Sequence, residues 1–197
     1  MNAKKIVTAG LALVMVAGIS VAGTLAFLTD DTDPVKNTFV VGDGVTITLD
    51  EAPVDENGKE TTGSRVNQNT YNPIPGGTYD KDPTVHVTGD DCYVFVKVDN
   101  GIYGSEGTNT IESQILESWS AVEGHTGVYY YDADKNNVPD VKSAGDDCVV
   151  FEKFTIGDLS NEAYKALDGE TIVVNAFAIQ SENVNLATAI QNLPQGW

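Results

Sequence analysis

Four residues with oxygen-bearing side chains lie at alternate or nearly alternate positions in the segment 132–140, the spacing of a calcium-binding loop. They are Asp132, Asp134, Asn136 and Asp140. Ca²⁺ takes oxygen ligands from such positions, and Val138 offers a backbone carbonyl there. Two departures predict weak binding, because Asn137 replaces the turn glycine and Ser143 replaces the bidentate glutamate. We favour the alternative, a hairpin tip with turn residues at 135–137 that joins the strand at 129–131 to the next strand.

The two histidines are not spaced as zinc ligands. A zinc peptidase usually places two histidines one helical turn apart with a glutamate between them, whereas His86 and His125 lie far apart in the chain. The chain also has no Gly-x-Ser-x-Gly elbow and no glycine-rich phosphate loop. We therefore predict no catalytic residues and no enzyme activity. We also predict no cofactor; weak calcium binding in the segment 132–140 is the alternative that stays open.

The two cysteines occupy matching contexts. Cys92 and Cys148 each follow a Gly-Asp-Asp tripeptide and each open an apolar strand. In an exported chain an even number of cysteines favours a disulfide, and two buried thiols are the alternative. The neighbouring aspartates would raise the thiol pKa, so a catalytic cysteine is not expected.

Short strands separated by turns must position these residues. The segment 45–49 alternates apolar and polar side chains, as a half-exposed strand does. Further strands are expected at 84–87, 92–98, 128–131, 149–154 and 171–179. The last of these is apolar on both faces, so we expect it to lie centrally in a sheet. The pattern predicts an all-β fold, a two-sheet antiparallel sandwich that resembles a jelly roll and carries a few short helices.

Three short helices are expected between the strands. An apolar stripe after Asn109 predicts the first, with Trp119 as its last member; the second is expected to begin near Ser160, and the third near Asn185. Residues 51–75 are rich in Asn, Gly, Thr and charged residues and are expected to form a long exposed excursion. Functional loops are common among such segments.

The composition is strongly acidic, with a formal net charge of −18 at pH 7. This charge excludes nucleic acid and anionic membrane surfaces as favourable partners. It also makes copies of the chain repel one another, so self-assembly should be favoured by salt or divalent cations.

The first 26 residues have the form of an export signal. Lys4 and Lys5 precede an uncharged run from 6 to 22, and small residues precede a cleavage site between Ala26 and Phe27. We therefore expect a signal peptide at 1–26, an extended segment at 27–36 and a β-sandwich domain at 37–197. The mature protein is expected outside the cytoplasm and free of the membrane; a retained membrane anchor is the alternative.

The head of the chain resembles the TasA/camelysin family of secreted proteins from Gram-positive bacteria. The resemblance is carried by Gly23-Thr24-Leu25-Ala26-Phe27-Leu28-Thr29-Asp30, by Asn37-Thr38-Phe39-Val40-Val41-Gly42 and by the strand from Val45 to Glu51. Weaker similarity follows at 75–83, 92–98 and 173–180. The segments around 57 and 132–147 do not match.

The resemblance implies a subunit of extracellular biofilm-matrix filaments, released by a dedicated signal peptidase and joined to copies of itself or to related matrix subunits by donor-strand exchange. An extended segment from one subunit would add a strand to an unpaired sheet edge of the next. The expected donor strand is Phe27, Leu28, Thr29, Asp30, Asp31, Thr32, Asp33, Pro34, Val35 and Lys36. Removal of the signal peptide would free this segment and so act as the assembly switch.

Three alternatives stay open. Residues 27–36 contain three aspartates and a proline, which suit a flexible terminus better than a strand. Some camelysin relatives are described as metallopeptidases, although the chain lacks the zinc motif. A monomeric cell-surface module that binds a ligand or acts as an adhesin would remain monomeric after signal removal, whereas a matrix subunit would polymerise.

Overall fold

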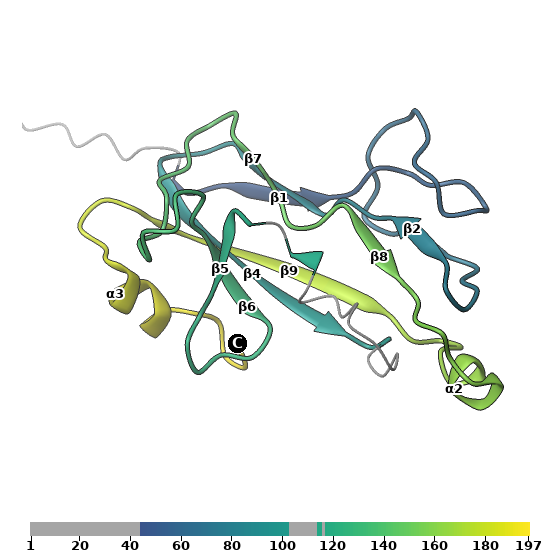
Figure 1. The fold of residues 1–197 in the computed structure, drawn as a ribbon. Helices are drawn as coiled ribbons and strands as arrows, with labels where there is room; N and C mark the ends of the chain where they lie inside the picture. Colours follow the sequence, from purple (N-terminus) through teal and green to yellow (C-terminus); the bar gives the residue numbers. More distant parts are fainter. Residues whose placement is uncertain (1–43, 103–113, 116) are drawn as a thin grey trace, which may run out of the picture. The chain divides into compact units, whose positions relative to one another are not determined.

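The computed structural model describes residues 44–102, 114–115 and 117–197, which lie within one compact unit, Val41–Trp197. The predicted signal peptide, cleavage site and donor strand, residues 1–36, lie outside the described residues. Most of the regular elements are strands, and all of the strand pairs are antiparallel (Figure 1). The predicted all-β fold with a few short helices is confirmed. Within the described ranges, no helix is long and apolar enough to cross a membrane.

The first sheet has the strand order β1 (Ile47–Asp50), β3 (Thr84–Val87) and β7 (Asp147–Val149). Its β3–β7 ladder is extended by the pair of β2 (Thr78–Asp80) and β8 (Lys153–Thr155). Between the two pairs, the N–H of Lys81 donates to the carbonyl of Glu152 at 3.0 Å and the N–H of Val150 to that of Pro83 at 2.9 Å. The ladder therefore keeps one register through an interruption at Pro83, which has no N–H.

The second sheet has the order β5 (Trp119–Ala121), β6 (Val128–Tyr131), β4 (Cys92–Asn100) and β9 (Ile172–Gln180). The prediction that residues 171–179 lie centrally is wrong. They form the edge strand β9, and β4 lies between β6 and β9. Both faces of β9 carry partly buried apolar residues, Val174 on the shared core and Phe177 on the Phe95 cluster, although Val173 is exposed. Hydrogen bonding to a second neighbour leaves no trace in side-chain composition.

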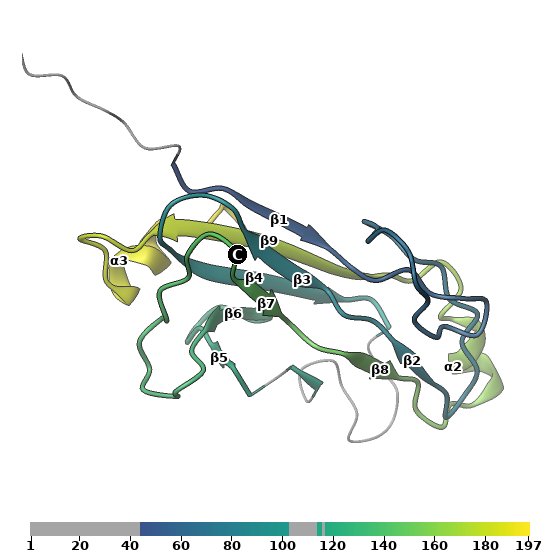
Figure 2. The same cartoon turned by 90° about the horizontal axis from the view of Figure 1, so that it is seen from above.

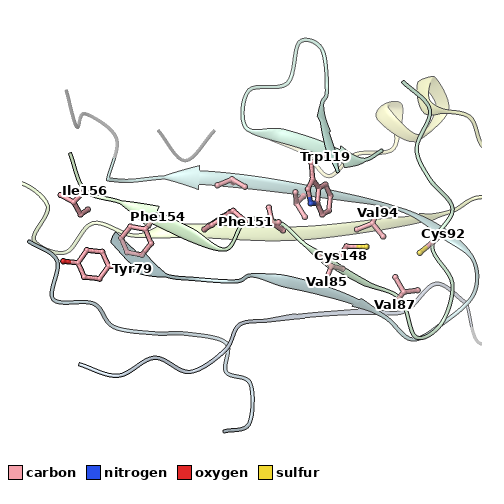
Figure 3. Close-up of a cluster of buried hydrophobic side chains, with 13 residues drawn as sticks. Tyr79, Val85, Val87, Cys92, Val94, Trp119, Cys148, Phe151, Phe154 and Ile156 are labelled. Carbon is pink, nitrogen blue, oxygen red and sulfur yellow. The ribbon is translucent and has the colours of Figure 1, made fainter. Parts of the chain in front are cut away.

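The two sheets share one buried core (Figure 3). Val85 of β3, Cys148 of β7 and Val94 of β4 belong to the same cluster. The indole N–H of Trp119 donates to the carbonyl of Val149 at 2.7 Å, which ties β5 to β7 of the other sheet. A second cluster on the other face of β4 centres on Phe95 and is covered by α3 (Leu186–Gln191) and the chain's last residues (Figure 2).

Two of the predicted helices are confirmed. In α2 (Asn161–Lys165) the N-cap Ser160 accepts a hydrogen bond from the N–H of Ala163, and in α3 the N-cap Asn185 accepts one from the N–H of Thr188. The helix predicted after Asn109 falls largely outside the described residues. Its predicted last member, Trp119, instead opens β5, because its ring packs between the sheets and against Tyr131.

Candidate functional site

β1 and β9 are the edge strands of the two sheets, and they are also neighbours in space without a hydrogen-bonded ladder between them. The two edges therefore lie on the same side of the molecule, as Figure 2 shows. Within the described ranges neither strand has a ladder partner on its outer side. Unpaired edges of this kind accept an additional strand.

The direction of the β9 backbone groups follows from the bonds at its two ends. The N–H of Gly101 donates to the carbonyl of Thr171 at 2.8 Å, and the N–H of Ser181 donates to that of Asp91 at 3.2 Å. Since hydrogen-bonded residues alternate along an antiparallel strand, the odd-numbered residues of β9 pair with β4. The even-numbered residues 172–180 therefore direct their N–H and C=O groups away from the sheet.

A groove of about 1270 Å³ opens beside this edge. It runs from the end of β1 to the beginning of β9, and the segment 67–74 and the region of α2 form its walls. The apolar residues that line it include Leu49, Ile74, Phe154, Ile156, Ile172 and Val174. Two of the lining residues are exposed, Ile74 to 62% and Val173 to 43%, so apolar surface is open to solvent here.

Three aromatic rings support one wall of the groove. Tyr71 meets Phe154 edge-on at a centroid distance of 4.9 Å, and Tyr79 stacks on Phe154 at 5.3 Å. The Tyr79 hydroxyl accepts a hydrogen bond from the Ile74 N–H at 2.7 Å, and the Tyr71 hydroxyl donates to the Asp80 carbonyl at 2.9 Å. Burial, with the nearby charge of Glu51, raises the pKa of Tyr71, so its hydroxyl stays protonated.

An ionic network fixes the end of β1 that borders the groove. The Arg65 guanidinium contacts the carboxylates of Asp50 and Asp82 and donates to the Thr84 hydroxyl at 2.9 Å. Lys81 pairs with the buried Glu51. These contacts link the excursion at 51–75 to β1 and β3, so that the groove wall is held to the sheet.

His86 joins all three strands of the first sheet. From β3, its Nε2 lies 2.9 Å from Asp50 of β1 and its Nδ1 lies 2.5 Å from Asp147 of β7. His125 lies in a loop, and its Nδ1 is 2.9 Å from the Trp197 carbonyl oxygen. His86 therefore links neighbouring strands of the first sheet, and His125 contacts the backbone of the chain's last residue.

The predicted calcium-loop residues do come together. One carboxylate oxygen from each of Asp132, Asp134 and Asp140 lies within 4.8 Å of the others. Each carboxylate is also engaged within the chain: Asp132 accepts from the Ser120 hydroxyl at 2.8 Å, Asp134 from the Asn136 side-chain amide at 2.8 Å and Asp140 from the Ala133 N–H at 2.8 Å. The three carboxylates therefore have hydrogen-bond partners within the chain, and weak calcium binding stays an untested alternative.

The turn predicted at 135–137 is present, but the hairpin is not. Lys135 and Asn137 have φ values of 56° and 64°, the left-handed region that a tight turn uses. The Asp140 N–H closes the loop on the Tyr131 carbonyl at 2.9 Å. The chain then pairs through Lys142 with Cys92 of β4, so it does not return along β6 as a hairpin strand.

Cys92 and Cys148 lie on strands of different sheets, β4 and β7, within one core cluster. Both thiols are free in the structure and fully buried. Burial raises the pKa of Cys92 to about 11 and that of Cys148 to about 12, so neither thiol is a nucleophile at neutral pH. The disulfide stays a prediction.

Sequence reasoning missed the groove, although one of its walls lies inside the excursion at 51–75 that was singled out as a functional loop. The segment Asn67–Ile74 carried the signal: polar amides followed by Tyr71, Pro73 and an isolated Ile74. No family model, no curated protein and no solved structure matches this chain.

Proposed function

We propose that this protein is a secreted structural subunit whose open β9 edge and adjacent groove receive an extended N-terminal segment from a second copy of the chain. The observation that carries the proposal is β9 itself. It is a nine-residue apolar strand without a partner on its outer side among the described residues. A long, apolar, unprotected edge favours association unless it is covered, so a soluble protein gains by supplying its own occupant.

The chemistry of the groove suits such an occupant. Main-chain hydrogen bonds to residues 172, 174 and 176 would fix the register, and the apolar lining would take side chains that alternate along the incoming strand. The candidate donor begins with Phe27 and Leu28, which are large enough to act as anchors. The resemblance of the head of the chain to the TasA/camelysin family supports the same assembly, in which extracellular matrix filaments grow by donor-strand exchange.

Electrostatics set the condition for assembly. The chain is strongly acidic, and Asp50, Asp168 and Glu170 line the groove together with Lys81 and Lys165. A donor that carries Asp30, Asp31 and Asp33 would be repelled at low ionic strength. Filament growth should therefore increase with salt, because screening shortens the reach of this repulsion to about 8 Å near physiological ionic strength.

The test is negative-stain electron microscopy of the mature protein beginning at Phe27, across salt concentration, together with two variants. Val173→Lys places a charge at the groove edge, and Val138→Lys is the matched control, because Val138 is 52% exposed and lies outside the groove lining. We expect filaments from the parent and from Val138→Lys, and monomers from Val173→Lys. Edge lysines are a device by which natural sheets block strand addition.

Two further samples test the donor. A chain with an N-terminal tag before Phe27, or one lacking residues 27–36, should remain monomeric. Normal filaments from the chain lacking 27–36, or from Val173→Lys, would contradict the proposal. Monomers from the parent under every condition would favour the alternative of a monomeric ligand-binding module.

A further inference from the structure

Three side chains of different chemistry meet beside the groove: an amine, a carboxylate and a carboxamide. Lys81 follows β2, Glu51 follows β1, and Asn69 lies in the excursion at 51–75. The Lys81 Nζ donates to Oε2 of Glu51, and the Asn69 Nδ2 donates to Oε1 of Glu51 at 3.0 Å. The amine and the carboxamide are therefore bound to the two oxygens of one carboxylate.

The ion pair in this trio is shielded from water. The side chains of Lys81 and Glu51 are 11% and 5% exposed, whereas those of the surface pair Lys59 and Asp80 are 54% and 26% exposed. Lysine and glutamate are rarely buried to this extent, because the pair loses hydration that its own attraction only partly replaces. A shielded lysine beside a group that accepts its proton can act as a nucleophile.

Asn69 is held in one orientation by three hydrogen bonds. Its Nδ2 donates to the carbonyl of Ala52 at 2.8 Å as well as to Glu51, and its Oδ1 accepts from the N–H of Val54 at 3.1 Å. Two of these neighbours accept and the third donates, so the oxygen and the nitrogen of the amide are not interchangeable. The Val54 N–H contacts the oxygen on which negative charge would develop if Cγ were attacked, as a donor in an oxyanion hole does.

We propose that Lys81 and Asn69 form an intramolecular isopeptide bond, with Glu51 as the group that transfers the protons. Nζ attacks Cγ of Asn69, the Nζ–Cγ bond forms, the Cγ–Nδ2 bond breaks, and ammonia leaves. No other reactant is required, because one amide replaces another. This inference does not depend on the proposed function.

The proton transfers balance through Glu51. Its carboxylate first takes a proton from the Lys81 ammonium, which frees the lone pair of Nζ. After the attack Glu51 gives this proton to Nδ2 and takes a second one from Nζ, so that the leaving group is neutral ammonia. The ammonia then takes the second proton and departs as ammonium, and Glu51 is a carboxylate again. Asn69 lines the groove, which gives the product a path to solvent.

Backbone hydrogen bonds hold the reacting side chains in place. Glu51 exchanges two 2.8 Å hydrogen bonds with Val66, and the N–H of Lys81 donates to the carbonyl of Glu152 at 3.0 Å. Fixed placement of this kind raises the effective concentration of an amine beside an amide by orders of magnitude. The bond would join the excursion at 51–75 covalently to the residue that follows β2.

The test is denaturing mass spectrometry of the mature chain beginning at Phe27, followed by peptide mapping. We expect a mass below that of the sequence by about 17 Da, the mass of the ammonia lost. Trypsin should not cut after Lys81, because an amide nitrogen carries no charge. Peptides separated by cleavage after Tyr71 and Tyr79 should remain joined through residues 69 and 81.

Two variants should block the reaction. Lys81→Arg keeps a cation but has no attacking amine. Glu51→Gln keeps the shape of the side chain but cannot transfer the protons, which should slow bond formation by at least about a hundredfold. Lys59→Arg is the matched control, because it changes the lysine of an exposed pair and should leave the mass loss as it is in the parent.

The parent chain alone decides the question if a variant fails to fold. The full mass of the sequence, with tryptic cleavage after Lys81, would overturn the inference and leave the trio as a buried ion pair. A loss of ammonia that maps to another asparagine, such as Asn57 before Gly58, would overturn it as well. The same would follow if Lys81→Arg kept the mass loss of the parent.

Discussion

The stability of the first sheet should depend on pH through His86. Burial acts to lower the pKa of His86, but the hydrogen bonds and charges of Asp147 and Asp50 outweigh it and raise the pKa. Arg65 also contacts Asp50, so the network contains two cationic side chains and three carboxylates, the third being Asp82. A histidine with a raised pKa in the folded state stabilises that state fully below its unfolded pKa, about 6.5, and the contribution is lost as pH rises through the folded pKa.

The magnitude follows from the exposure of the two partners. A hydrogen bond to a charged group contributes about 1.5–3 kcal/mol when shielded from water. The side chain of Asp147 is 61% exposed, so its share falls below about 1 kcal/mol, as for surface ion pairs. Asp50 is 24% exposed, and its Oδ1 is shared between His86 and Arg65. Together we expect a stabilisation of about 1–2 kcal/mol, or roughly 2–8 °C in Tm for a chain of this size.

The assay is thermal unfolding of the parent and of His86→Gln between about pH 5.5 and pH 8.5 at constant ionic strength, a range that spans the histidine titration. The difference in Tm should be largest at the acid end and should shrink as pH rises. His125 is the chain's other histidine and is present in both proteins, so its titration cancels. A difference that stays constant, or that grows with pH, would refute the reasoning.

Three further predictions concern the groove, the acidic loop and the cysteines. Phe154→Ala should lower the free energy of unfolding by about 3–5 kcal/mol in urea denaturation, because it removes a buried ring on which two tyrosines pack; a loss below about 1 kcal/mol would show that the site collapses around the cavity. Millimolar calcium should leave Tm unchanged, since the carboxylates of Asp134 and Asp140 are engaged within the loop, and a clear rise would establish a calcium site. Cys92 and Cys148 should not react with a thiol reagent in the native protein at neutral pH, because burial raises the pKa of both thiols. In denaturant, two reactive thiols would exclude the disulfide, and no reactive thiol would establish it.

Local signals in the sequence were sufficient for most of the elements. The strand at 84–87 and that at 128–131 match the predicted ranges, and both capped helices begin where Ser160 and Asn185 indicate. These features depend on alternation and on side-chain oxygens a few residues from the backbone groups they bind. Which strands pair with one another, when they lie far apart in the sequence, has no such local signal.

The unpredicted features all depend on distant contacts. Trp119 reads as the end of a helical stripe, yet its indole bonds to Val149 of the other sheet. The edge position of β9 depends on which strands occupy the other side of β4, and its own residues carry no information on that. The groove likewise exists because Arg65 and Tyr79 hold the excursion at 51–75 against the sheet, through partners such as Asp82 and the Ile74 N–H.

The long ladder between β4 and β9 has a mechanical consequence. Nine register pairs join the two strands from Cys92–Gln180 to Asn100–Ile172. A pull along the strand axis loads all of these hydrogen bonds in shear at once, whereas a pull across the axis would open them one after another. A subunit held at the outer edge of β9 would pass tension lengthwise into β4, which carries buried residues of both core clusters. Stretching single chains by the two geometries should therefore give a much higher rupture force along the strands than across them.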